Sequence, residues 1–125
     1  MQTRQTMIVL CGLALAWGWL QTAWGHAFPQ RAEPSAGATL AAAPALVRIW
    51  FDAALEPAFS SLRVQTAHGQ PITHEEGQVD ASDATLLTAR LPPLEPGTYR
   101  VLWSVVARDG HRTEGTYTFT VQRGP

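Results

Sequence analysis

Two runs of alternating apolar residues near the C-terminal end of the sequence constrain the fold more than any other feature. Their apolar side chains recur at every second position: Tyr99, Val101, Trp103 and Val105 in the first run, and Tyr117, Phe119 and Val121 in the second. A period of two is typical of a β-strand with one buried face. The polar segment between the runs contains Asp109-Gly110-His111. The pattern therefore predicts two half-buried strands joined by a tight connection.

The rest of the chain predicts more short strands separated by proline and glycine. We expect strands at 45–51, 60–66 and 85–91, a weak edge strand around Ile72, and an edge strand or extended arm at 26–31, where Pro29 removes a backbone donor. Residues 33–44 are predicted to form a loop because prolines and a glycine interrupt them. Without a helical period of useful length, the sequence predicts an all-β, two-sheet antiparallel β-sandwich.

The first 25 residues read as a cleavable signal peptide. A polar start is followed by an apolar, uncharged run from 7 to 20, and Ala23-Trp24-Gly25 places small residues at the −3 and −1 positions of a cleavage site. The run is shorter than the about 20 residues of a membrane-spanning helix, which favours a signal over a retained anchor. Cleavage after Gly25 makes His26 the first residue, whereas cleavage after Ala23 would leave Trp24 first and cleavage after Ala27 would remove the histidine.

The predicted mature chain, residues 26–125, is a single domain without a disulfide. Its length is 125 − 25 = 100 residues, and the only cysteine, Cys11, lies in the signal peptide. The domain must therefore be stabilised by its apolar core, for which this length suffices.

Charge argues against two classes of partner. The mature chain keeps eight arginines and ten acidic residues, a net charge of 8 − 10 = −2, with no lysine and no basic stripe. Nucleic-acid binding is disfavoured. No long basic amphipathic segment indicates insertion into a membrane surface after the signal is removed.

A histidine at a new N-terminus offers an unusual metal ligand. Its α-amine and imidazole Nδ1 can close one chelate ring, and His111 and Asp109 can add a third nitrogen and an oxygen. Three nitrogens and one oxygen favour tetragonal Cu(II), although zinc could use the same atoms less tightly. The mature chain has neither Cys nor Met, the soft ligands of Cu(I). We therefore predict one Cu(II) ion per chain, bound by His26, Asp109 and His111.

The same residues also have ordinary interpretations. An Asp-Gly-His triplet between strands is often a simple turn, in which Asp accepts a backbone N–H and Gly supplies a positive φ. A histidine beside a cleavage site can be accidental. The other two histidines read as surface residues: His68 lies in a turn, and His74 adjoins Glu75 and Glu76. Trp50 and Trp103 are expected to pack on the sheets.

Three segments of the chain stand out together: HAFPQRAEPSAGATL at the mature start, IWFDAALEP, and LEPGTYRVLWSVVARDGHRTEGTYTFTV near the end. Over these segments the chain resembles the CopC copper-resistance proteins of the bacterial periplasm. The resemblance implies a Greek-key β-sandwich of the cupredoxin-like or immunoglobulin-like kind, without catalytic activity, that holds Cu(II) through the N-terminal histidine and the aspartate and histidine of the Asp-Gly-His turn. It further implies a periplasmic role in storing or carrying copper for copper homeostasis or resistance, with an inner-membrane partner of the CopD type.

The chain departs from some members of the family. Residues 65–84 contain no methionine, where some members have a methionine-rich loop for Cu(I), and Phe28 occupies the third mature position, where some have a further histidine. Two other functions are compatible with these residues. An N-terminal histidine chelate is also the copper arrangement of lytic polysaccharide mono-oxygenases, which would make the protein a small enzyme. The last alternative is a metal-free immunoglobulin-like interaction module.

Overall fold

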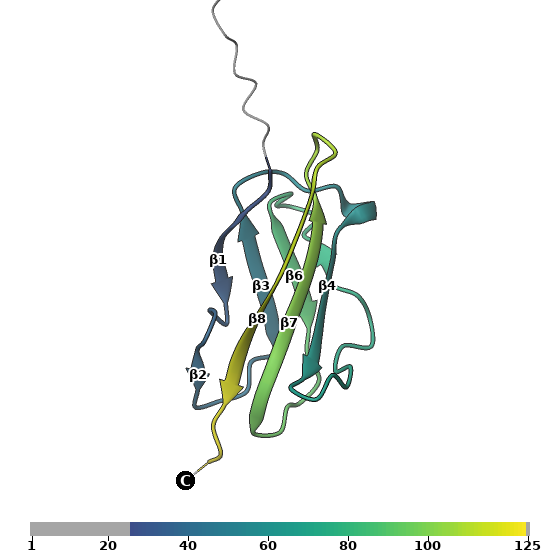
Figure 1. Ribbon diagram of the computed structural model, residues 1–125. Coiled ribbons are helices and arrows are strands. Elements are labelled where there is room, and N and C mark those ends of the chain that lie inside the picture. Colours follow the sequence, from purple (N-terminus) through teal and green to yellow (C-terminus); the bar gives the residue numbers. More distant parts are fainter. Residues whose placement is uncertain (1–25, 125) are drawn as a thin grey trace, which may run out of the picture.

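The computed structural model describes residues 26–124, which form a sandwich of two four-stranded sheets (Figure 1). The first sheet has the order β1-β3-β6-β5 and the second the order β2-β8-β7-β4. The elements in chain order are β1 (Pro29–Glu33), β2 (Thr39–Leu40), β3 (Leu46–Phe51), the 3-10 helix η1 (Pro57–Phe59), β4 (Ser61–Thr66), β5 (Gln78–Val79), β6 (Leu86–Arg90), β7 (Gly97–Val106) and β8 (Arg112–Val121). The prediction of an all-β sandwich is confirmed.

The predicted signal peptide, residues 1–25, lies outside the described residues. Within the part of the chain that the structure describes, no helix has the length and apolar character needed to cross a membrane.

The hairpin of β7 and β8 is the longest paired unit, as the alternating runs predict. Its antiparallel register extends from Gly97 opposite Val121 to Val106 opposite Arg112. The connection turns at Gly110, whose φ of +90° is a conformation that glycine adopts without steric cost. The hairpin therefore carries the Asp-Gly-His segment at its tip.

The core lies between the sheets and consists of the inward-facing apolar rows. Its largest fully buried side chains are Phe119, Ile49, Leu55, Leu62, Leu87, Val47, Val64, Val101 and Val105. Tyr99 stacks on Phe119 at a centroid distance of 5.5 Å, and its hydroxyl donates a hydrogen bond of 2.5 Å to the backbone carbonyl of Glu95. This bond satisfies the phenol at the end of the core, as the tyrosine corner does in other sandwiches.

Two expectations about minor elements were wrong. The weak edge strand is β5, Gln78–Val79, which pairs with β6, whereas Ile72 belongs to no strand and donates its backbone N–H to the carbonyl of Val64. The predicted loop at 33–44 contains β2, which pairs parallel to β8. Both strands have two residues, which is too few for an alternation of apolar and polar side chains. Their pairing depends on backbone hydrogen bonds, which the sequence does not reveal.

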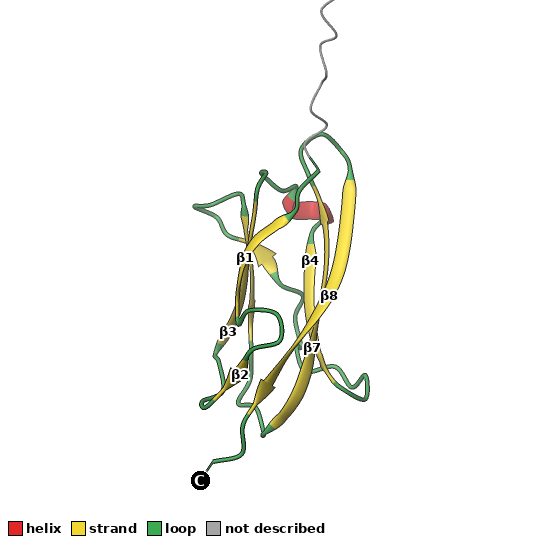
Figure 2. Ribbon diagram, turned by 60° about the vertical axis from the view of Figure 1, so that its left-hand side comes forward, coloured by secondary structure: helices red, strands yellow, loops and turns green. Residues whose placement is uncertain are grey.

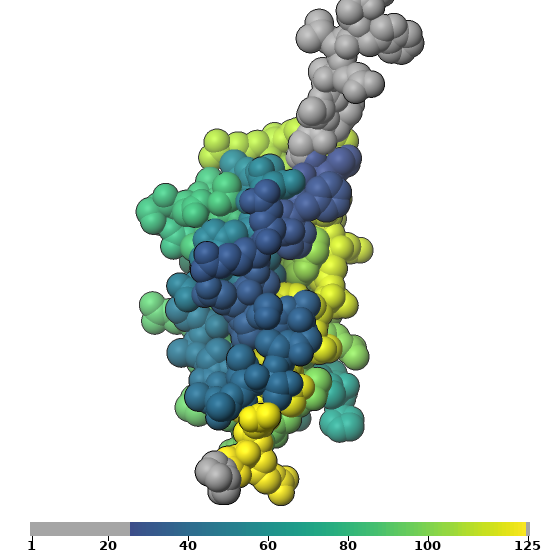
Figure 3. All heavy atoms as spheres, turned by 90° about the vertical axis from the view of Figure 1, so that its left-hand side faces the viewer, coloured from purple at the N-terminus to yellow at the C-terminus, as the bar shows by residue number. Residues whose placement is uncertain are grey.

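The two ends of the sandwich differ. The hairpin tip and the start of the described chain lie at one end, and the end of the described chain lies at the other (Figures 1 and 2). The loop between β3 and β4, which includes η1, packs at the hairpin end, where Glu56 donates its N–H to Val106 and Arg108 donates to Ala54. Seen from the side, the N-terminal segment spreads over one face next to β8 (Figure 3). The fold therefore collects the N-terminal arm, one loop and the hairpin tip at a single end.

Candidate metal centre

The structure brings His26 into contact with His111. Their ring centroids lie 4.8 Å apart, with an angle of 63° between the ring planes. His26 precedes β1 and His111 precedes β8, so the two rings come from opposite ends of the described chain. Two imidazoles at this separation can contribute nitrogen donors to one metal ion.

Asp109 contacts His111 within the hairpin tip. Its Oδ1 accepts the backbone N–H of His111 at 3.0 Å, and its Oδ2 lies 3.1 Å from His111 Nδ1. The first contact and the positive φ of Gly110 are the features of the ordinary turn interpretation, so turn and candidate site are built from the same residues. A carboxylate on one ring nitrogen is also the arrangement that orients a metal-binding imidazole, and a metal would then be bound through Nε2.

The electrostatics of the tip keep the Asp109 carboxylate charged. The hydrogen bond from the His111 backbone lowers the pKa of Asp109 below its ordinary value, and the His111 side chain and the charge of His26 lower it further. A charged carboxylate beside two imidazoles is a suitable environment for a divalent cation.

The N-terminal arm is held by hydrogen bonds on both sides. Ala27 is fully buried, and its carbonyl accepts a hydrogen bond of 2.6 Å from the Thr113 hydroxyl. Phe28 donates its N–H to Asp52 Oδ1 at 2.7 Å, and Asp52 donates its own N–H to the Phe28 carbonyl at 3.0 Å. Sequence reasoning missed Asp52 and Thr113; the available signal was that Thr113 is a polar residue in the inward row of β8.

Phe28 lies beside the candidate site. Its ring is 5.9 Å from that of His26 and tilted by 58°, and 53% of the residue is exposed. Its side chain contributes an apolar surface next to the imidazoles and no atom that could bind a metal ion.

The three predicted residues contact one another in two pairs, His26 with His111 and His111 with Asp109. Across residues 26–124, no group of three or more His, Cys, Asp or Glu side chains is already arranged to hold a metal ion. The donor chemistry nevertheless fits Cu(II), because two imidazoles and a carboxylate converge at one end of the sandwich and a processed His26 would add its amine. Ligation of one ion by all three side chains would require a local adjustment of those side chains.

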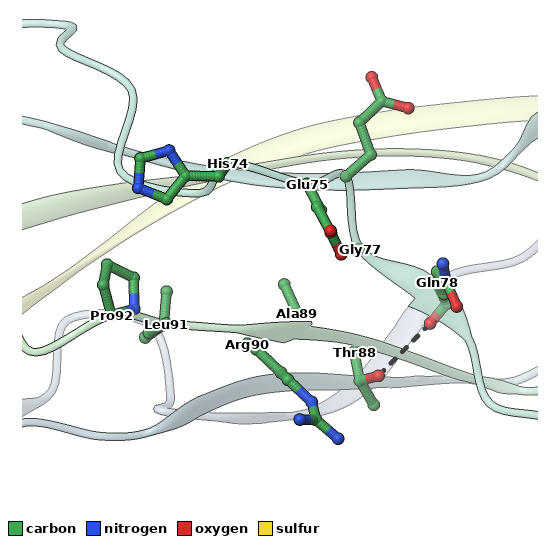
Figure 4. A pocket seen from close by; sticks show the side chains of 10 residues that line it. His74, Glu75, Gly77, Gln78, Thr88, Ala89, Arg90, Leu91 and Pro92 are labelled. Carbon is green, nitrogen blue, oxygen red and sulfur yellow. Dashed lines mark hydrogen bonds between the residues drawn. The ribbon is translucent and has the colours of Figure 1, made fainter.

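A second polar cluster lies elsewhere, around a hollow of about 360 Å³ between the segment that carries His74 and β6 (Figure 4). His74, Glu75 and Glu76 are exposed, as expected for a surface patch. Thr88 of β6 donates a long hydrogen bond of 3.5 Å to the Gln78 carbonyl across this region. The hollow shares no residue with the His26, Asp109 and His111 cluster.

Both tryptophans of the described chain pack on the sheets as predicted. Trp50 lies on the outer face of the first sheet, with the Arg31 guanidinium 4.3 Å from its ring centroid. Trp103 contacts Phe51 edge to face, with centroids 5.3 Å apart.

Comparison with known proteins identifies the family. The CopC domain model matches residues 30–122, which is most of the chain. The chain belongs to the CopC family. The crystal structure of CopC from Methylosinus trichosporium OB3b shares 38% identity and a TM-score of 0.73, and covers 78% of this chain and 94% of that one. PcoC from Escherichia coli, described as a methionine-rich copper resistance protein, shares 28% identity and a TM-score of 0.68 over 78% of this chain and all of that chain (100%).

Curated relatives of this CopC-family chain include proteins of different lengths. Protein YobA of Escherichia coli K12 is 35% identical over 100 residues, which are 79% of this chain and 81% of YobA. Copper transport protein CutJ of Bacillus subtilis is 26% identical over 102 residues, which are 81% of this chain and only 19% of CutJ. A CopC-like region thus occurs both in a small protein and within a much longer copper transport protein.

Proposed function

We propose that this CopC-family chain is a periplasmic Cu(II)-binding protein that stores or carries copper for copper homeostasis or resistance. The single observation that carries the proposal is the contact between His26 and His111, with the Asp109 carboxylate on the same His111 ring. Membership of a family whose solved members include a copper resistance protein supports it.

The ligand set we propose is the α-amine and imidazole of His26, the imidazole of His111 and the Asp109 carboxylate, one copper ion per chain. The amine exists only after removal of residues 1–25, so the proposal includes the signal peptide and its cleavage after Gly25. Nitrogen and oxygen donors without thiolate or thioether select Cu(II) over Cu(I). Protons compete for the imidazoles and the amine, so binding should weaken below about pH 5–6.

We propose a binding role without catalysis. The chain is small, and the described site has a carboxylate in contact with one candidate ligand, which would disfavour oxygen activation at the metal. A mono-oxygenase would need copper that reacts with oxygen beside a surface for an extended polysaccharide, and about 100 residues leave little beyond the sandwich to build one.

We also propose a membrane partner of the CopD type. Its support is CutJ, in which the region similar to this chain is joined to further sequence in one copper transport protein. A separate small protein with the same domain would exchange copper with such a partner by docking.

Copper titration of the exported protein tests the proposal. The full precursor is expressed, the product is purified from the periplasm, and its first residue is determined by mass spectrometry. We expect His26 at the N-terminus, one Cu(II) per chain, and an electron paramagnetic resonance spectrum of a tetragonal nitrogen and oxygen site. A product that begins elsewhere, or remains without copper at equimolar metal, would contradict it. Ascorbate-driven peroxide formation and polysaccharide cleavage by the copper form would instead indicate an enzyme.

A further inference from the structure

We infer that Thr113 and Asp52 are positioning residues that hold His26 against His111 before copper arrives. The inference rests on the proposed Cu(II) function and names the residues that preorganise the site. Thr113 Oγ1 donates to the carbonyl of Ala27 at 2.6 Å, and Asp52 Oδ1 accepts the N–H of Phe28 at 2.7 Å. The two hydrogen bonds fix the residues directly after His26.

Thr113 links the arm to the strand that follows the second histidine. It lies two residues after His111, at the start of β8, and faces inward in the row that includes Tyr117 and Phe119. Because His111 directly precedes β8, the strand whose Thr113 hydroxyl binds the arm, only a short segment of backbone connects the two imidazoles through this hydrogen bond. A threonine at this inward position is otherwise unexplained by the apolar core around it.

Asp52 holds the arm from the other side. It follows β3 and forms a reciprocal pair with Phe28, accepting its N–H and donating to its carbonyl at 3.0 Å. Between these contacts the Ala27 side chain is 0% exposed, so it is a small apolar anchor in the end of the core. Hydrogen bonds on both sides and a buried methyl group leave residues 27–28 little room to move.

Preorganisation matters here because the proposed chelate uses a chain terminus. The first residues of a domain are usually poorly ordered unless they are tied down. When only a fraction of molecules holds the binding-competent arrangement, the apparent affinity falls by that fraction. Neither Thr113 nor Asp52 needs to touch the metal for its removal to weaken copper binding.

The test compares Thr113→Val, which removes the hydroxyl at nearly constant shape, with Thr113→Ser, which keeps it. Thr116→Val is the matched control, since Thr116 is an exposed threonine on the same strand. Asp52→Ala tests the second contact independently. All are exported from the full precursor, and the N-terminus is checked by mass spectrometry.

Loss of one such hydrogen bond should raise the copper dissociation constant about 3- to 10-fold in Thr113→Val and in Asp52→Ala. Thr113→Ser should restore most of the affinity and Thr116→Val should match the wild type. At saturating copper, the electron paramagnetic resonance spectra should equal that of the wild type, because the ligands are unchanged. A copper affinity that stays within twofold of wild type in both variants, or an altered spectrum in Thr113→Val, would overturn the inference.

A metal-free measurement separates this inference from the proposed function. Hydrogen exchange at the Phe28 amide reports directly on arm docking, and we expect protection in the wild type and faster exchange in Asp52→Ala and Thr113→Val. Fast exchange in the wild type would refute the positioning role even if copper binds. Protection in a wild type that binds no copper would leave the arm docked as described and refute the proposed function. Urea unfolding identifies any variant that does not fold, and the Thr113→Ser rescue then decides the outcome.

Discussion

The carboxylate of Asp109 contacts His111 through both of its oxygens, one on the backbone N–H at 3.0 Å and the other on ring Nδ1 at 3.1 Å. A two-residue step across Gly110 thus fixes both the direction of the turn and the orientation of the imidazole. The local geometry and the proposed metal chemistry depend on the same carboxylate, so experiments must separate its two roles.

The pKa of Asp109 should be measurably low in the metal-free protein and should respond only partly to loss of the His111 ring. The largest cause of the lowering is the backbone N–H of residue 111, which His111→Ala retains. An NMR titration of the side-chain carboxyl carbon should therefore place the pKa of Asp109 in His111→Ala between that of the wild type and the ordinary aspartate value of about 3.9.

The sign of the linked stability follows from that direction. Because folding lowers the pKa of Asp109, its contribution to stability is complete above the unfolded pKa and is lost as the pH falls through the folded pKa. Asp109→Asn should be less stable than the wild type in urea at pH 7, and the difference should shrink on acidification below about pH 4. A stability gap that widens in acid would contradict this assignment.

Removal of the two hairpin residues should affect copper binding unequally. His111→Ala deletes a proposed nitrogen ligand and should weaken binding by more than about 100-fold, beyond what the loss of a supporting group costs. Asp109→Ala should cost about 10- to 100-fold, whether the carboxylate is a ligand or orients His111. Competition titration measures both, and the electron paramagnetic resonance spectrum of Asp109→Ala distinguishes the roles. His68→Ala, in an exposed turn, should bind like the wild type.

One extra residue before His26 should be nearly as damaging as His26→Ala. An added alanine converts the α-amine into a peptide nitrogen and removes half of the proposed chelate while the imidazole stays. The measurement is the copper dissociation constant of an exported protein whose first residue is verified. An alanine added after Pro125 is the control, and equal affinity in both extended proteins would refute the amine ligand.

Gly115→Ala should destabilise the fold without touching the site. A Cβ on Gly115 would lie 2.6 Å from Cζ2 of Trp103, its cross-strand neighbour, so the indole would have to shift. Overpacking of this kind costs about 1–3 kcal/mol. Urea unfolding followed by tryptophan fluorescence measures it. Gly124→Ala, with nothing within 4 Å of the added Cβ, should change stability by less than about 0.5 kcal/mol.

The hairpin and the core were predictable from sequence because their signals are repeated many times. Alternation over 99–105 and 117–121 predicts which side chains face inward, and each run lies within a strand of ten residues. By contrast β2, Thr39–Leu40, has too few residues for a period and pairs only through its backbone.

The candidate site was predictable in its residue types and less so in its supports. Histidine at a processing site and the Asp-Gly-His triplet are visible by inspection, and the structure brings His26 to His111; their ligation of copper stays a prediction. The bonds that hold the arm join positions 86 and 24 residues apart. No pattern in the sequence indicates that Thr113 or Asp52 contacts the arm, and only tertiary packing shows that both do.

The hairpin tip and the end of the described chain lie at opposite ends of the sandwich, so the candidate site faces away from the tail. A ten-residue strand such as β7 spans about 33 Å, so a tether attached behind Gly124 would hold the proposed copper site at roughly that distance from its anchor. If the domain were immobilised or fused through its C-terminal tail, His26 and His111 would point away from the anchor. The tether would then not block a copper acceptor that approaches the site.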